Sequence, residues 1–131
     1  MQTKFLTTMK SGFTYIMTNK HHNVLYTGCT TDIVRRVWQH KNHYYKGSFT
    51  DKYNCEYCVY YESFPNYNLS IERENQIKNM SRQEKIDLIN QMNPEWKELV
   101  TEKGFMRKPE PWSEQVKRVM DELFGETKKE V

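Results

Sequence analysis

The stretch from Val24 to His40 carries side chains that suit the binding of an anionic group. Tyr26 lies at the end of a short apolar strand, which breaks at Gly28. Arg36 and His40 follow, four residues apart in a predicted helix. Residues with that spacing are neighbours on one helix surface. The sequence therefore predicts a tyrosine facing an arginine and a histidine across a glycine turn, which would hold a group such as a phosphate.

The elements that position these groups follow from caps and apolar periodicity. Alternating apolar residues predict a strand over 12–18, antiparallel to the strand that ends at Gly28 because a polar turn of hairpin length joins them. Tyr15 and Tyr26 then lie on adjacent strands, and the register decides whether they share a face. The helix has three candidate caps, Thr30, Thr31 and Asp32, and an apolar stripe of Ile33, Val34, Val37 and Trp38.

The rest of the chain adds one strand and several helices. An aromatic and β-branched run predicts a third strand over 55–64. A helix capped by Asn68 or Ser70 should end near Met80, and the capping box Ser81-Arg-Gln-Glu84 should start the next one. A further helix is expected from Asn93-Pro94 to Lys103-Gly104, with Trp96, Leu99 and Val100 inward.

These elements predict an α/β (α+β) fold, a small three-stranded antiparallel sheet flanked by helices with additional C-terminal helices. We expect residues 1–104 to form the main domain. Residues 105–131 are expected to form a proline-stiffened linker and an amphipathic helix that Ser113 begins and Gly125 ends. That helix should pack on the domain or form the seam of a homodimer, because its apolar stripe needs a surface.

Composition limits the kind of protein. The 131 residues carry a net charge of +3, made of +6 over residues 1–53 (eight Lys/Arg, two Asp/Glu) and −3 over the remainder (twelve against fifteen). A basic first half suits a polyphosphate partner, although composition alone favours the simpler explanation of a solvated basic surface. Three cysteines make no disulfide framework, and no apolar run reaches the length of a membrane span. We expect a cytoplasmic protein with reduced thiols and no membrane contact.

Two further patterns have competing explanations. Over residues 42–54, cations alternate with aromatic rings, which suits a nucleic-acid backbone and its bases but also describes an ordinary tyrosine-rich loop. Cys55 and Cys58 form a lone C-x-x-C, and we expect free core cysteines rather than a zinc site, since residues three apart on a strand point to opposite faces.

Taken singly, the candidate site residues have ordinary explanations as well. A strand tyrosine is usually a packing residue, Arg36 resembles a surface charge beside Arg35, and Glu74 resembles half of a helix ion pair with Lys78. Considered together, they carry a family resemblance. Leu25-Tyr26-Thr27-Gly28 resembles the YIG half of the GIY-YIG nuclease motif, and Phe13-Thr14-Tyr15 resembles the GIY half.

Arg36 and Glu74 extend this resemblance, because they fall where that family keeps its catalytic arginine and its metal-binding glutamate. The resemblance spans roughly residues 12–93 and is strongest to compact, excinuclease-C-like single-domain members. It implies a metal-dependent endonuclease that hydrolyses phosphodiester bonds in DNA, with a role in repair or recombination.

The resemblance also implies residue roles. A single Mg²⁺ or Mn²⁺ would be held by Glu74, Tyr15 would be the general base, and Tyr26 and Arg36 would position and neutralise the phosphate. His40 would orient water or phosphate. The cations expected to contact nucleic acid are Arg35, Lys41, Lys46, Lys52 and Lys78. Tyr15, Tyr26, Arg36 and Glu74 should converge on a solvent-open basic patch beside the first helix.

The sequence departs from the family pattern in several places. Phe13 stands where the first motif has glycine, and Cys29 stands where excision-repair relatives carry a lysine. Glu72 competes with Glu74 for the metal, and Asn93 corresponds only loosely to a downstream asparagine of relatives. Two function classes therefore stay open: a metal-dependent DNA endonuclease, and a catalytically silent nucleic-acid-binding or protein-interaction module that retains the fold.

Overall fold

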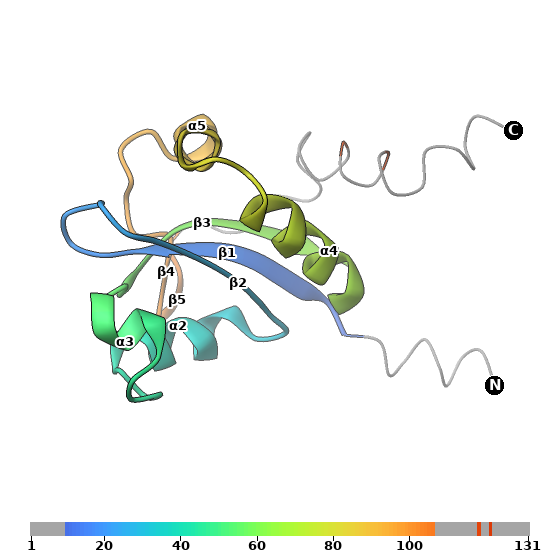
Figure 1. Ribbon diagram of the computed structural model, residues 1–131. Coiled ribbons are helices and arrows are strands. Elements are labelled where there is room, and N and C mark those ends of the chain that lie inside the picture. Colours follow the sequence, from blue (N-terminus) through green and yellow to red (C-terminus); the bar gives the residue numbers. More distant parts are fainter. Residues whose placement is uncertain (1–9, 107–117, 119–120, 122–131) are drawn as a thin grey trace, which may run out of the picture.

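The computed structural model describes residues 10–106 together with Arg118 and Asp121. The chain runs through a hairpin, two helices, a third strand, two more helices and a short second hairpin (Figure 1). The strands are β1 (Gly12–Thr18), β2 (Leu25–Thr30), β3 (Tyr57–Phe64), β4 (Val100–Thr101) and β5 (Gly104–Phe105). The helices are α2 (Ile33–Lys41), α3 (Phe49–Tyr53), α4 (Tyr67–Lys78) and α5 (Arg82–Met92).

All strand pairs in the sheet are antiparallel, and the order is β2-β1-β3-β4-β5. The predicted α+β class and the antiparallel hairpin of the first two strands are confirmed. The predicted number of three strands is wrong, because the two-residue strands β4 and β5 extend the sheet beyond β3. β2 is an edge strand, so its outer side is open to other groups.

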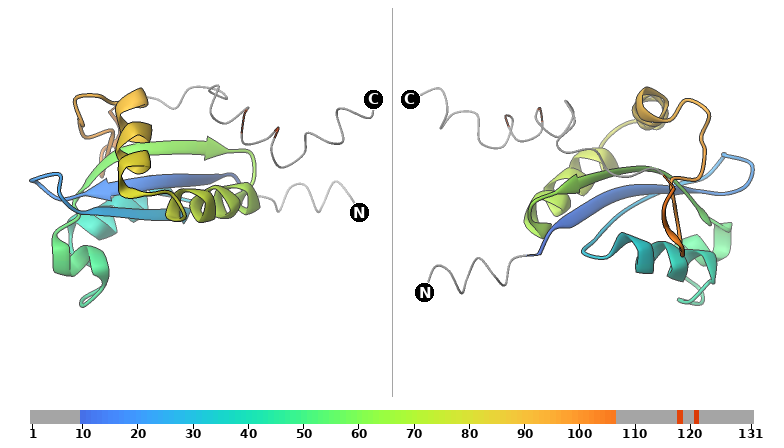
Figure 2. Two further views of the ribbon diagram at one scale, coloured as in Figure 1. Left: turned by 45° about the horizontal axis from the view of Figure 1, so that its top comes forward. Right: turned by 180° about the vertical axis from the view of Figure 1, so that it is seen from behind.

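Two cores cover the two faces of the sheet. On one face, Tyr15 and Met17 of β1 pack with Ile33 and Val37 of α2. On the other, Ile16 packs with side chains of β3, α4 and α5. The alternation along β1 follows from the period of two in a strand. Helices α2 and α3 therefore lie on one side of the sheet, and α4 and α5 lie on the other (Figures 1 and 2).

Side-chain caps set the helix starts. Asp32 accepts a hydrogen bond from the Arg35 amide at the start of α2, as one of the three candidates predicted. Ser81 and Glu84 form the predicted capping box of α5. The predicted caps of α4 are wrong, because Asn66 caps that helix. Asn68 and Ser70 lie inside it, and Ser70 is buried with its hydroxyl donating to Tyr67 O.

The helix expected after Asn93-Pro94 is absent among the described residues. Asn93 ends α5 as predicted, but its side chain then binds the backbone of Val59 and Lys97. Trp96 has a φ of +54°, which a right-handed helix does not tolerate. The Leu99 amide donates to Cys58 O, so the segment joins the sheet as β4. Gly104, with a φ of +118°, turns the chain into β5 instead of closing a helix.

Residues 42–54 contain a helix that the sequence did not suggest. Ser48 accepts from the Asp51 amide at the start of α3, and Asn54 ends it in the left-handed conformation. The third strand begins at Tyr57, two residues after the predicted start, and Cys55 and Cys58 are buried free cysteines as expected.

The predicted linker and last helix, and with them the predicted dimer seam, lie largely outside the described residues. The boundary between residues 1–104 and 105–131 stays a prediction. None of the helices in the described part of the chain has both the length and the apolar character of a membrane span.

Candidate active site

Tyr15 and Tyr26 share the face of the sheet that α2 covers. In the β1–β2 register, Tyr15 is opposite Gly28 and Met17 is opposite Tyr26. Because residues two apart on a strand point the same way, both tyrosine rings lie on one side. Their ring centroids are 6.4 Å apart, and the His40 ring lies 5.7 Å from the first and 5.4 Å from the second.

A buried chain of hydrogen bonds begins at Tyr15. Its hydroxyl lies 2.9 Å from Nε2 of His40, and Nδ1 of the same imidazole lies 2.9 Å from Oγ1 of Thr50. All three residues are buried. A neutral imidazole has one donor nitrogen and one acceptor nitrogen. The tautomer of His40 therefore decides which of its two hydrogen bonds it donates and which it accepts.

Burial favours the neutral forms of His40 and Tyr15 and shifts their pKa values accordingly. It lowers the pKa of His40 to about 4, and the positive charge of Arg36 adds to the effect. It raises the pKa of Tyr15 well above the ordinary value, and the neighbouring Tyr26 also raises it, although Arg36 acts in the opposite direction. At neutral pH the site therefore holds a protonated phenol against a neutral imidazole.

Arg36 is the half-buried cation of this group. Burial lowers its pKa, but interactions with the hydroxyls of Tyr15 and Tyr26 outweigh that effect and leave the pKa raised. Its Nη1 donates to Gln39 Oε1 at 3.0 Å, and its Cζ lies 5.2 Å from the centroid of the Tyr45 ring. A guanidinium fixed on its edge and on its face keeps donors available for an anion.

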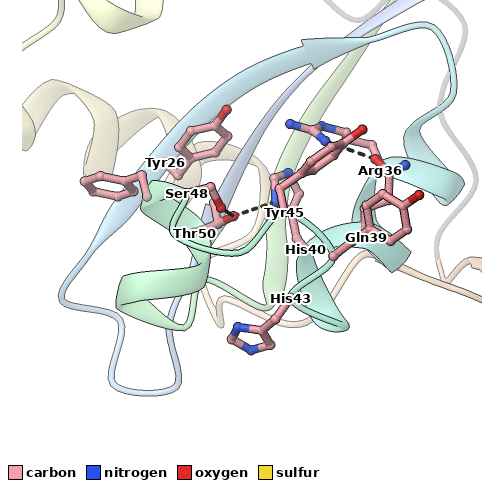
Figure 3. Close-up of a pocket in the computed structure, with 10 residues that line it drawn as sticks. Tyr26, Arg36, Gln39, His40, His43, Tyr45, Ser48 and Thr50 are labelled. Carbon is pink, nitrogen blue, oxygen red and sulfur yellow. Dashed lines mark hydrogen bonds between the residues drawn. The ribbon is translucent and has the colours of Figure 1, made fainter.

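Arg36 and Tyr26 line a small cleft with a volume of about 70 Å³ (Figure 3). Its wall comes from β2, α2, the following loop and the start of α3. The other lining residues are Gln39, His40, His43, Tyr44, Tyr45, Ser48, Phe49 and Thr50. A second hollow, which opens to solvent, continues from the same arginine toward Lys10 and Arg35. The arrangement offers a fixed cation to an anion that enters from solvent.

Gly28 separates the Tyr15 hydroxyl from the edge of the sheet. A Cβ at this position would lie 2.6 Å from the Tyr15 hydroxyl oxygen and 2.7 Å from its Cζ. Such distances are shorter than side chains can adopt, so the phenol packs directly against the glycine backbone. The glycine of the second motif therefore makes room for the tyrosine of the first.

Glu74 comes from α4, which packs on the other face of the sheet from α2. It extends from α4 to the end of β2, where the Cys29 thiol donates to Glu74 Oε1 at 3.5 Å. Its second oxygen forms an ion pair with Lys78 at 3.3 Å, one helical turn further on. No hydrogen bond or ion pair joins Glu74 to Tyr15, Tyr26, Arg36 or His40.

The structure therefore brings together four of the five predicted site residues. The convergence of Glu74 with these groups stays a prediction: α4 and α2 pack on opposite faces of the sheet, and the Glu74 carboxylate reaches the β2 edge at Cys29. The expectation of a solvent-open site is wrong for Tyr15, which the aromatic core buries together with His40. The link between Glu74 and these groups runs through neighbouring residues of β2: Cys29 contacts the carboxylate, and Gly28 packs against the Tyr15 ring.

The donor set near Glu74 fits a hard divalent cation held through few protein ligands. Within residues 10–106, no three His, Cys, Asp or Glu residues gather as a metal site. Mg²⁺ commonly binds through one or two carboxylates and keeps its other positions for water and substrate phosphate. A single half-buried carboxylate at an open sheet edge meets that requirement. Glu72 is exposed, and the intervening Arg73 is buried in an ion pair with Glu62.

The predicted nucleic-acid contacts differ in their accessibility. Arg35, Lys46, Lys52 and Lys78 are exposed. Lys41 is held by an ion pair with Glu98 and lies over the Tyr57 ring, on the side of α2 that faces β4. Asn93 is buried, and its side chain binds the backbone of Val59 and Lys97, so in this structure it supports the fold.

Three residues of the site escaped the sequence analysis. Thr50 is hydrogen-bonded to His40, Gln39 accepts a hydrogen bond from Arg36, and the Tyr45 ring lies under the guanidinium of Arg36. Gln39 lies three residues from Arg36 on the same helix, a spacing that could have identified it. Thr50 had no such signal, because it depends on the unexpected helix α3.

Comparison with known proteins places this geometry in a family. Residues 11–87, more than half of the chain, match the GIY-YIG catalytic domain. The chain is also 36% identical over 87 residues to the UPF0213 protein of Syntrophus aciditrophicus (strain SB), an alignment that covers 66% of this chain and 98% of that protein. No solved structure matches the chain. The chain therefore belongs to the GIY-YIG family, whose catalytic domain is typically that of a nuclease.

Proposed function

We propose that this protein is a metal-dependent endonuclease that hydrolyses phosphodiester bonds in DNA. The observation that carries the proposal is the position of Arg36, which faces both motif tyrosines at the mouth of a cleft. A role in DNA repair or recombination would be consistent with this activity.

The phosphate is expected to bind where Arg36 meets Tyr26. Hydrolysis adds negative charge to the phosphate oxygens, and a fixed guanidinium stabilises that charge without reorganisation during the reaction. Gln39 and Tyr45 hold this guanidinium in place. The half-exposed Tyr26 hydroxyl would position the same oxygens from the cleft wall.

The Tyr15–His40 pair would position the phenol for its role as general base. Burial keeps Tyr15 protonated at neutral pH, so its role as a base depends on stabilisation of the phenolate by the neighbouring Arg36. The imidazole of His40, whose pKa of about 4 makes it a weak base, would orient the phenol through the hydrogen bond between the Tyr15 hydroxyl and Nε2 rather than take its proton.

A divalent cation such as Mg²⁺ or Mn²⁺ would be held by Glu74 at the edge of β2. Bound there, it would supply Lewis-acid stabilisation of a phosphate oxygen and lower the pKa of a coordinated water. The chain's own contribution is the carboxylate of α4, which the Cys29 thiol and the Lys78 ammonium orient in the free protein.

The test is cleavage of labelled duplex, nicked, flapped and branched DNA with and without Mn²⁺. Glu74→Gln should abolish the metal-dependent cleavage and leave DNA binding nearly unchanged, because the carboxylate acts through the cation. Glu72→Gln is the matched control, since it removes an exposed carboxylate two residues away on the same helix. Metal-dependent cleavage that survives Glu74→Ala combined with Glu72→Ala would exclude the proposal.

The pairing of Glu74 with Lys78 also favours a second candidate, a module that binds nucleic acid without cutting it. There the carboxylate would serve only as a helix ion pair. The same experiment separates the two, because this candidate requires DNA binding with no cleavage of any substrate at any metal concentration.

A further inference from the structure

An aromatic patch surrounds the mouth of the cleft. Within residues 10–106, the exposed large hydrophobic side chains are Trp38, Tyr44, Tyr45, Phe49, Tyr53 and Met106. The first five come from one segment of sixteen positions, residues 38–53, and we call these five the aromatic patch. Single exposed hydrophobic residues are ordinary, but five rings gathered on one surface mark an interaction site.

The rings of the aromatic patch stand on both sides of the cleft. On one side Trp38, Tyr44 and Tyr45 contact one another in sequence, with centroids 6.0 Å and 4.9 Å apart. On the other, Phe49 packs against Tyr53 at 4.7 Å. Tyr44, Tyr45 and Phe49 also line the cleft itself. The patch is therefore continuous with the place where Arg36 would hold a phosphate.

The charges around the aromatic patch favour an anionic partner. Residues 35–53 contain five Lys/Arg (Arg35, Arg36, Lys41, Lys46 and Lys52) against the single acid Asp51. Asp51 is already engaged, since it accepts from the Gly47 amide at 2.7 Å and contacts Nδ1 of His43 at 2.8 Å. The cations Arg35, Lys46 and Lys52 of this segment are exposed.

Local contacts anchor the segment that carries these rings. His43 bridges Asp51 of α3 and Glu56 ahead of β3, at 2.8 Å and 2.5 Å. Ser48 caps α3, and Thr50 is tied to His40. Rings held on such a frame lose little conformational freedom when a ligand stacks on them, which favours binding.

We infer that the aromatic patch binds the unpaired bases of a single-stranded nucleic acid while the surrounding cations and Arg36 hold its phosphates. This inference rests on the proposed function, because it names the substrate class that the same cleft would receive. Flat rings interleaved with cations stack on bases of any sequence. In a duplex the base faces are already stacked and cannot reach such rings, so a duplex would meet only the cations. A substrate with an unpaired stretch at the cleft, such as a flap or a free strand, gains both contacts.

The test measures binding of the full chain by fluorescence anisotropy, in a chelator so that no cleavage occurs. The probes are a labelled mixed-sequence DNA strand of about 15 nucleotides and the duplex of the same sequence. Tyr44→Ala and Tyr53→Ala remove one ring from each side of the cleft, and neither ring contacts Arg36. Tyr44→Phe and Tyr53→Phe are the matched controls because they keep the rings, and thermal melting checks the fold of every variant.

The wild-type protein should bind the single strand more tightly than the duplex. Each alanine variant should lose about tenfold in single-strand affinity with little change for the duplex, and each phenylalanine variant should keep the wild-type values. Equal losses for both probes, or none in a folded alanine variant, would overturn the inference. Such a result leaves the proposed function standing if the wild type still cleaves DNA. If the alanine variants lose single-strand binding but the wild type cuts no DNA, the result would support the aromatic patch and refute the nuclease proposal.

Discussion

The hydroxyl of Tyr15 lies 2.9 Å from Nε2 of His40, so the tyrosine of the first motif is tied to a buried imidazole on α2. This contact joins the centre of the sheet to the helix that carries Arg36. It has a consequence for stability as well as for chemistry, because the imidazole is held in its neutral form.

The first prediction concerns acid stability. His40 has a folded pKa of about 4, below the value near 6.5 expected in the unfolded chain. Its contribution should be fully present above pH 6.5, decline as the pH falls from 6.5 to 4, and level off below that. The total loss should be about 3 kcal/mol.

Urea unfolding of the wild type and of His40→Gln between pH 7.5 and 4 checks this. Glutamine does not titrate, so the free-energy difference between the two proteins should shrink with falling pH while other acid effects cancel. A difference that stays constant across the range would show that folding does not shift the pKa of His40.

The second prediction concerns the electrostatic link between Arg36 and His40. Burial is the main cause of the low pKa of His40 and Arg36 is the second, so Arg36→Gln should raise that pKa without restoring the ordinary value. NMR titration of the imidazole measures it. Arg35→Gln, one residue away and exposed, should leave the titration unchanged, and an equal shift in both variants would contradict the assigned contact.

The third prediction concerns Gly28. Gly28→Ala should destabilise the protein by about 1–3 kcal/mol, since the new methyl group meets the Tyr15 ring end. In a Tyr15→Leu background the same change should cost less, because the phenol end is gone. A double-mutant cycle by denaturant unfolding measures the coupling. Additive effects would mean that the clash is relieved elsewhere.

The fourth prediction concerns the bridge from His43 to Asp51 and Glu56. Hydrogen bonds that the protonated imidazole donates to Glu56 and Asp51 raise the pKa of His43, so its stabilising contribution should be fully present below pH 6.5 and lost as the pH rises through the raised value. His43→Gln should therefore lower the Tm more at pH 6 than at pH 9. His21→Gln, which removes an exposed histidine in the β1–β2 turn, is the matched control.

The sequence by itself determined the hairpin, the capping box at Ser81 and the spacing of the motif residues, and it narrowed the cap of α2 to three candidates that include Asp32. Caps and hydrophobic periodicity act over a few residues, so they can be recognised without knowing the fold. Arg36 and His40 share a helix surface for the same local reason. The motif resemblance also indicated the family that the comparison of residues 11–87 confirmed.

Only the tertiary structure decided which groups meet. Glu74 was expected beside Arg36, but its distance along the chain carries no information about which face of the sheet α4 covers. The helix expected after Asn93 became a strand because Leu99 and Val100 found partners on β3, where long-range hydrogen bonds outweigh local propensity. Burial of Tyr15 and His40, and with it their altered pKa values, arises from packing between a sheet and a helix, and therefore exists only once the chain has folded.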